Sequence, residues 1–339
     1  MEERKRQCDP TKHLERPLHG VGLCEIEEMS EAYRSKFSFE LVKRIMVPNL
    51  FWNENEHEIN INISSISCFD GKNCIVAPNG DKLVLIYDKD GNEMLRDIIH
   101  FRVVDIAMGL KGYPLIIENG TSTIYEYRFG ESRKLFRSQP LLPYAISSLN
   151  DGKVVLVGTV STRTLLEAEF QRRGAMRVYK YNGQIVSEAL REHGEYLFDF
   201  PFHVCVSLEN NDIYVGDINK KKIMHFKKDC TFISSYTASE MRDAYMLVGG
   251  ISVENTHFLL SLTYIQTSKL LLASYHSGFG GGRIHVLSPN LEFLGLFHAD
   301  QNVGVPVGMS IDDDGNVFFG DNSDGIIRVF KLSEYVNNL

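Results

Sequence analysis

One repeated pattern constrains this chain more than any other feature of its sequence. An apolar run ends in an acidic residue, and six positions later an Ile opens a short Ile-x-x-aromatic run. The clearest copies are Asp217 to Phe226, Glu118 to Tyr127 and Asp321 to Phe330. Looser copies begin at Leu83, Met176 and Ile284. Successive copies lie 41 to 61 residues apart. Such a period is typical of repeat proteins, in which each copy is one supersecondary unit.

The surroundings of each copy define the unit. Two apolar runs joined by a turn precede the copy, and a further turn and run follow it. Asp70-Gly71, Asp151-Gly152 and Asp314-Gly315 are pairs that favour hairpin turns. This pattern predicts that each unit forms four short antiparallel strands. One such sheet cannot bury both of its faces, and radial repetition solves this problem. We predict an all-β fold, a six-bladed β-propeller.

The two ends of the chain predict how the ring closes. The sixth unit stops after its third strand, in "GIIRVFKLSEYVNNL", and an unassigned run, residues 37–48, precedes the first unit. We expect this N-terminal strand to complete the last blade, so that residues 37–339 form the propeller. Residues 1–36 show no repeat and are expected to be a disordered tail. Residues 244–275 hold one strand too many, which leaves the inner strand of blade five open. An insertion, residues 161–175, is expected to form a short helix or a loop.

Composition narrows the class of protein. The chain is 43% hydrophobic and 24% charged, as in ordinary globular domains. It has no apolar run of membrane-spanning length, and its charged start, "MEERKRQCDP", does not resemble a secretory signal. Six scattered cysteines do not predict a disulfide framework. These features predict a cytoplasmic protein. With a net charge of -8, we expect neither DNA nor a membrane as partner.

Two segments resemble a known repeat family. "PFHVCVSLENNDIYVGDINKKKIMHF" and "VPVGMSIDDDGNVFFGDNSDGIIRVF" resemble NHL repeats, and the resemblance extends over residues 37–332. It is similar to the C-terminal propellers of tripartite-motif proteins, which implies binding of a protein or of structured RNA on one face. No Cys-x-x-Cys pair provides the zinc ligands of a RING or B-box. We therefore predict a non-enzymatic scaffold related to the substrate-recognition modules of these ubiquitin ligases.

The candidate binding residues are basic and aromatic, and they are expected on one face. Loops between second and third strands share that face with the segments that enter the inner strands. The candidates are Lys220, Lys221, Lys222, Phe202, His203, Arg163, Arg172, Arg173 and Arg283. A protein is the expected partner. The alternative is RNA, whose phosphates and bases such side chains bind. Charged loops that are simply solvated are a third interpretation of the same residues.

An enzymatic alternative is a propeller hydrolase or lyase with an axial metal. His203 stands at the mouth of its inner strand, where such enzymes place metal ligands. The equivalent residues in other blades are Ser65, Asp105, Tyr144 and Gly308. They do not form a plausible metal set. The spacing of Cys8, His13, His19 and Cys24 fits no zinc module. We therefore expect no metal and no cofactor.

Overall fold

Strands alone make up the regular structure of the residues described in a computed structural model. These residues are 37–47, 63–69, 73–78, 82–162, 171–237, 257–277, 281–299, 306–321 and 325–334. The chain divides into two units, Met1–Arg34 and Ser35–Leu339, and every described residue belongs to the second. The predicted tail, residues 1–36, lies outside the described residues. Within them, no helix is long and apolar enough to cross a membrane.

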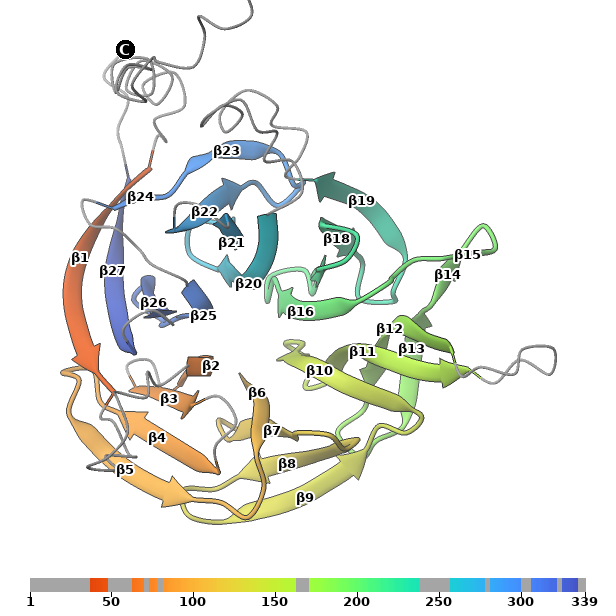
Figure 1. The fold of residues 1–339 in the computed structure, drawn as a ribbon, viewed down its shortest axis with the longest axis horizontal. Helices are drawn as coiled ribbons and strands as arrows, with labels where there is room; N and C mark the ends of the chain where they lie inside the picture. The colour runs from red at the N-terminus through yellow and green to blue at the C-terminus, as the bar shows by residue number, and fades with distance from the viewer. Residues whose placement is uncertain are drawn as a thin grey trace, which may run out of the picture. The chain divides into compact units, whose positions relative to one another are not determined.

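Six four-stranded antiparallel blades stand around a central axis, which confirms the predicted six-bladed β-propeller (Figure 1). Blade 1 contains β2 (Ile63–Phe69), β3 (Asn73–Pro78), β4 (Leu83–Tyr87) and β5 (Glu93–Ile98). Blade 2 contains β6 (Val103–Met108), β7 (Pro114–Glu118), β8 (Thr123–Tyr127) and β9 (Ser132–Arg137). Blade 3 contains β10 (Leu141–Ser148), β11 (Val154–Thr162), β12 (Gln171–Tyr179) and β13 (Ile185–Ala189).

The second half of the ring repeats this arrangement. Blade 4 contains β16 (Pro201–Val206), β17 (Ile213–Asp217), β18 (Lys222–Phe226) and β19 (Phe232–Thr237). Blade 5 contains β20 (His257–Ile265), β21 (Leu270–Ser277), β22 (Gly281–Leu287) and β23 (Phe293–Leu296). Blade 6 contains β25 (Pro306–Ile311), β26 (Asn316–Asp321), β27 (Ile326–Glu334) and β1 (Phe37–Met46). The first-named strand of each blade is its inner strand.

The N-terminal strand closes the ring, as the chain ends predicted. β1 pairs antiparallel with β27 from Phe37↔Glu334 to Met46↔Ile326. A two-residue strand, β24 (His298–Ala299), pairs in parallel with the outer side of β1. Phe39 of β1 is 3% exposed and stacks on Phe297 with ring centroids 3.8 Å apart. Strand pairing and apolar packing thus join the two ends of the described chain.

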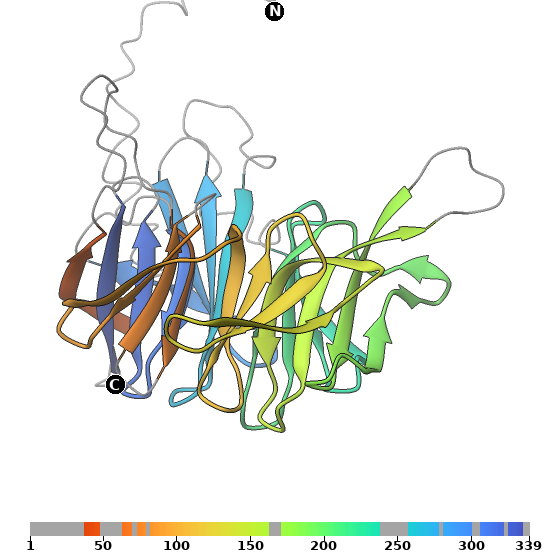
Figure 2. The same ribbon diagram turned by 90° about the horizontal axis from the view of Figure 1, so that it is seen from below.

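The structure resolves the inner strand of blade 5 and corrects the expected length of the insertion in blade 3. β20 is the inner strand of blade 5, which settles the alternative left open over residues 244–275. The insertion in blade 3 is shorter than expected, because β11 and β12 continue their ladder to Thr162↔Gln171 and project beyond the blade (Figure 2). Residues 163–170 lie outside the described residues. After blade 3, β14 (Arg191–Glu192) and β15 (Glu195–Tyr196) form a small hairpin.

The apolar core lies between neighbouring blades. Six buried clusters each join two adjacent blades; one of them packs Val157 and Met176 of blade 3 against Val204 and Val215 of blade 4. Near the axis, polar contacts add to this packing. The Cys68 N–H of blade 1 donates to Ser310 Oγ of blade 6 at 2.9 Å. The ring therefore holds six inner strands side by side around the axis, where side chains need not pack into a core.

Candidate functional site

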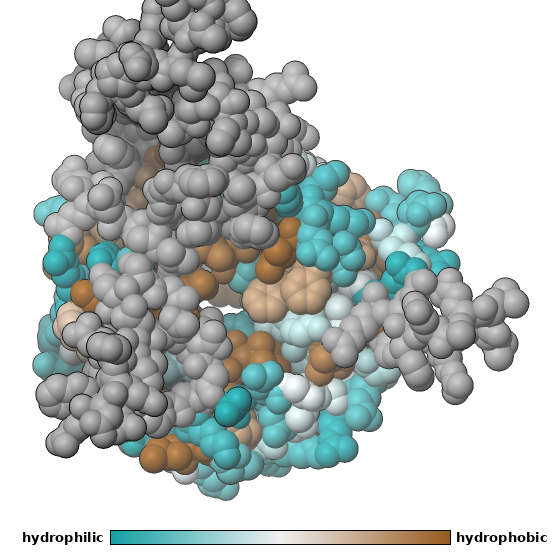
Figure 3. Space-filling model, in the orientation of Figure 1, coloured by the Kyte–Doolittle hydropathy of each residue, from teal (hydrophilic) through white to brown (hydrophobic). Residues whose placement is uncertain are grey.

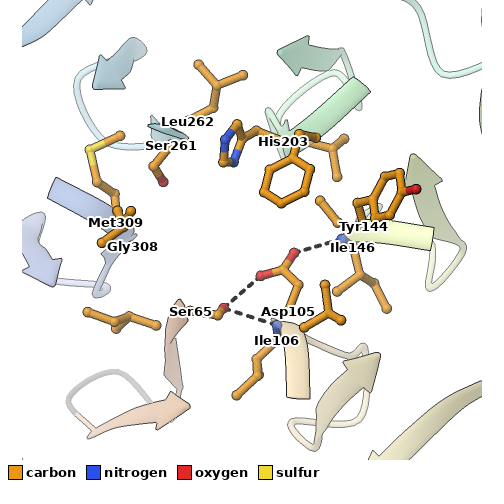
Figure 4. A pocket seen from close by; sticks show the side chains of 16 residues that line it. Ser65, Asp105, Ile106, Tyr144, Ile146, His203, Ser261, Leu262, Gly308 and Met309 are labelled. Atoms are coloured by element: carbon orange, nitrogen blue, oxygen red, sulfur yellow. Dashed lines mark hydrogen bonds between the residues drawn. The ribbon is translucent and has the colours of Figure 1, made fainter. Parts of the chain in front are cut away.

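A small cavity lies on the propeller axis, near the points where the inner strands begin. Its volume is about 90 Å³. Five residues expected to be equivalent line it, namely Ser65, Asp105, Tyr144, His203 and Gly308, and Ser261 completes the ring (Figure 4). We call this end of the ring the entry face. Figure 3 shows apolar side chains in brown around a hollow at its centre.

Asp105 is the carboxylate of this cavity, and it joins three blades. Its Oδ1 accepts a hydrogen bond from Ser65 Oγ at 2.7 Å, and its Oδ2 accepts one from the Ile146 N–H at 2.9 Å. Ser65 Oγ in turn accepts the Ile106 N–H at 3.1 Å. Burial raises the pKa of Asp105 to about 6, although these hydrogen bonds oppose the shift. The carboxyl therefore takes up a proton under mildly acidic conditions.

His203 is the base of the same cavity, and its pKa moves in the opposite direction. Burial lowers the pKa of His203 to about 4, and a hydrogen bond to the Leu259 backbone offsets this only in part. Its ring meets Phe202 edge-on at a centroid distance of 5.2 Å. The imidazole is therefore neutral at neutral pH, with a lone pair that can accept a proton.

The two shifts together produce an acid–base pair. Between pH about 4 and about 6, Asp105 holds a proton while His203 remains neutral. A neutral acid and a neutral base in one cavity are the protonation states that general acid–base catalysis needs. Ser261 lines the same space, and its hydroxyl group can hydrogen-bond a polar substrate group, whereas the Ser65 and Tyr144 hydroxyl groups are already hydrogen-bonded to Asp105 and Thr159.

The lining residues do not fit the axial metal of the enzymatic alternative. In the described part of the chain, no group of three His, Cys, Asp or Glu side chains is close enough to hold a metal ion. Protein metal sites usually take three or four such ligands. The cavity offers one carboxylate and one imidazole, and both carboxylate oxygens already accept hydrogen bonds. We therefore derive no chemistry through a metal.

A second and wider cavity opens at the opposite end of the axis. Its volume is about 690 Å³, and the turns that follow the inner strands surround it. Six apolar side chains, one from each blade, line both cavities: Ile66, Ile106, Ile146, Val204, Leu262 and Met309. The two cavities share this ring of apolar residues, and the acid–base pair lies on its entry-face side, in the smaller cavity.

One lysine of the predicted cluster, Lys220, makes hydrogen bonds within the protein. The Lys220 backbone N–H donates to Asp217 Oδ1 at 2.9 Å. Its Nζ donates to the carbonyl oxygens of Tyr196 and Leu197 at 2.8 and 2.7 Å. Lys221 adopts a positive φ of 54° in the turn, and Lys222 begins β18. The Lys220 ammonium group thus holds the segment that enters blade 4.

The other predicted binding residues do not all gather at one place. Phe202 and His203 line the axial cavity. Arg173 packs over the Tyr196 ring at 4.5 Å, and Arg191 packs over the same ring at 4.3 Å. Arg172 belongs to β12 and Arg283 to β22, but their side chains lie outside the described part, as does Arg163 altogether. Sequence reasoning missed Ser261, because the inner strand of blade 5 was ambiguous.

Comparisons with known proteins support the fold. The sequence matches no family model and no curated protein. A solved gluconolactonase from Xanthomonas campestris is 14% identical, with a TM-score of 0.57 over 80% of this chain and 86% of its own. A streptogramin B lyase is 13% identical, with a TM-score of 0.54 over 90% and 100%. A putative gluconolactonase is 12% identical, with a TM-score of 0.58 over 87% and 94%.

These structures correct the sequence-based prediction of activity. The neighbours support a propeller, but they do not single out the NHL propellers of tripartite-motif proteins. The prediction that this chain is not an enzyme rested on that resemblance. The finding that overturns this prediction is that a gluconolactonase and a streptogramin B lyase share the fold, so the propeller gives no ground for excluding an enzyme. The expected protein or RNA partner and the cytoplasmic location stay predictions.

Proposed function

We propose that this protein is a hydrolase that opens a lactone or cleaves an ester of a small molecule at the axial cavity. The observation that carries the proposal is the pairing of Asp105 and His203, whose pKa values burial moves in opposite directions. Strongly shifted groups that meet in one cavity are typical of acid–base sites. The names of the gluconolactonases among the structural neighbours support this choice of substrate class.

Each residue has one role in the proposed reaction. His203 takes a proton from a water molecule while that water attacks the carbonyl carbon. Asp105 gives its proton to the ester oxygen as the C–O bond breaks, so the products are a carboxylic acid and an alcohol. Exchange of one proton with solvent returns His203 to its neutral form and Asp105 to its protonated form. The hydroxyl group of Ser261, which lines the same cavity, donates to the carbonyl oxygen and orients it.

The test is hydrolysis of glucono-δ-lactone and of simple esters, followed by acid release over pH 3.5 to 8. We expect a bell-shaped profile of kcat/KM with its limbs near pH 4 and pH 6, set by His203 and Asp105. Asp105→Asn and His203→Gln should each lower kcat/KM about 10²- to 10⁴-fold. Asp199→Asn and His100→Gln, at exposed positions, are the matched controls. No hydrolysis of any lactone or ester would contradict the proposal.

A further inference from the structure

The entry to the axial cavity is shaped by an irregularity that the inner strands share. A register shift interrupts β10 between Pro143 and Ala145, and another interrupts β16 between Pro201 and His203. The extra residues are Tyr144 and Phe202, both aromatic and both in neighbouring blades. Bulges of this kind re-aim a side chain and are frequent beside active sites. Both residues line the axial cavity, and Figure 4 labels Tyr144 beside it.

Phe200 joins these two rings in a cluster, which we call the aromatic wall. The ring centroids of Tyr144 and Phe202 lie 5.5 Å apart, with an interplanar angle of 30°. Phe200 and Phe202 lie 5.6 Å apart at 17°, and Tyr144 and Phe200 lie 5.0 Å apart at 41°. All three residues are half-buried, and none belongs to the six apolar clusters between blades. The wall therefore adds aromatic surface beside the cavity without serving the core.

The wall is held in place before any ligand arrives. The Phe200 N–H donates to the buried Asp217 carboxylate, whose two oxygens lie 3.1 and 3.2 Å away. The Tyr144 hydroxyl group lies 3.1 Å from Thr159 Oγ1 and is hydrogen-bonded to it. Rings that are already fixed lose little conformational entropy on binding, and so a preformed wall favours a flat ligand.

The shape of the cavity separates the reacting end of a ligand from the rest of it. A volume of about 90 Å³ is well below the roughly 300 Å³ at which pockets for whole small ligands begin. Only the reacting group fits inside, beside Asp105 and His203. Across the axis from the wall, the lining residues Ser65 of blade 1 and Gly308 of blade 6 are small. The remainder of the ligand extends from the cavity, where Tyr144 and Phe202 of the aromatic wall offer it a flat apolar surface.

We infer that the aromatic wall binds a planar, apolar ring of the substrate, so that the substrate is an aromatic lactone or ester. This inference rests on the proposed function, because the ligand is a substrate only if the protein is a hydrolase. The binding of a flat ring can nevertheless be measured without turnover. Stacking on aromatic rings explains the preference, because a saturated ring of similar size lacks the flat face and the π-system.

The test compares dihydrocoumarin with octahydrocoumarin, two δ-lactones that differ in the aromaticity of the fused ring. Binding is measured by ligand-observed NMR with the full-length Asp105→Asn variant, and hydrolysis is measured with the unaltered protein. We expect dihydrocoumarin to bind about three- to tenfold more tightly and to have the lower KM. Phe202→Leu and Phe200→Leu, which keep apolar bulk, should remove this preference. Phe129→Leu should keep this preference, because Phe129 is 48% exposed and does not line the cavity.

The outcomes separate the two proposals. Preferential binding that Phe202→Leu removes, without hydrolysis of either lactone, would support the aromatic wall and contradict the proposed hydrolase. Hydrolysis of both lactones with equal KM would support the hydrolase and overturn the inference. Equal binding of both lactones, no binding of either, or a preference that survives in Phe202→Leu and Phe200→Leu, would also overturn the inference.

Discussion

Asp105 links the axial site to the stability of the ring. Its folded-state pKa of about 6 lies above the usual Asp value of 3.8, so the folded protein holds this proton more tightly than the unfolded chain does. The stabilisation is complete below about pH 4 and is lost as the pH rises through about 6. The free energy of unfolding of the unaltered protein, minus that of Asp105→Asn, should therefore fall by about 1–3 kcal/mol between pH 4.5 and pH 7.5.

Urea unfolding at the two pH values measures this difference. Asp105→Asn changes the hydrogen bonds as well as the charge, but that change contributes equally at both pH values. Asp199→Asn, at an exposed position, is the control for the loss of an aspartate charge in general. A difference that stays constant for Asp105→Asn would mean that this carboxyl has an ordinary pKa in the folded protein.

For individual residues, the sequence predicted positions in the site better than roles. His203 and Asp105 could be aligned because the repeat fixes where each inner strand begins. Their burial, which sets the pKa values, depends on residues of other blades and leaves no local pattern in the sequence. Tyr144 was aligned one residue too early, because Ala145 has the register of His203 and Tyr144 is the bulge residue, like Phe202. Lys220 shows the converse, since its charge suggested a ligand contact but its ammonium group binds the Tyr196 and Leu197 carbonyls.

Among the elements, β1 is the one whose partner lies farthest away in sequence. Phe39 of β1 is 3% exposed and contacts Phe297, whereas Val42 of the same strand is 57% exposed. Phe39→Ala should lower the free energy of unfolding by about 3–5 kcal/mol, because it leaves a cavity between blades 5 and 6. Val42→Ala should change it by less than about 0.5 kcal/mol. Chemical denaturation measures both, and equal effects would show that β1 does not pack as described.

Strands were predictable where a turn signal or the repeat delimited them. The third strand of every blade contains its predicted anchor residue, from Leu83 in β4 to Ile327 in β27. The inner strand of blade 5 was not predictable, because residues 244–275 contain more apolar runs than one blade needs. The bulges at Tyr144 and Phe202 were also not predictable. A bulge adds one residue to a run without changing its composition, and only pairing with the next strand reveals it.

In the molecule as a whole, the six blades have similar core residues but different residues at the axis. Packing between blades demands similar apolar residues in every repeat, and this demand made the six-bladed fold predictable. The residues at the axis do not pack between blades, so they can differ from blade to blade. Blade 2 has a carboxylate there, blade 4 an imidazole and blade 6 a glycine. The proposed function depends on these differences, and a repeat-based family resemblance therefore predicts the fold but not the activity.

Ring closure by β1 gives the last prediction. A chain of residues 35–339 keeps every described strand, whereas a chain of residues 48–339 lacks β1 and leaves the edge of β27 unpaired. We expect the first to unfold at the urea midpoint of the full-length protein. The second should unfold at a lower midpoint and should self-associate, because an unpaired strand edge and the uncovered apolar side chains of Phe297 and Phe330 favour association. Denaturation with size-exclusion chromatography measures both effects. A monomeric 48–339 chain with an unchanged midpoint would show that the ring closes without its N-terminal strand.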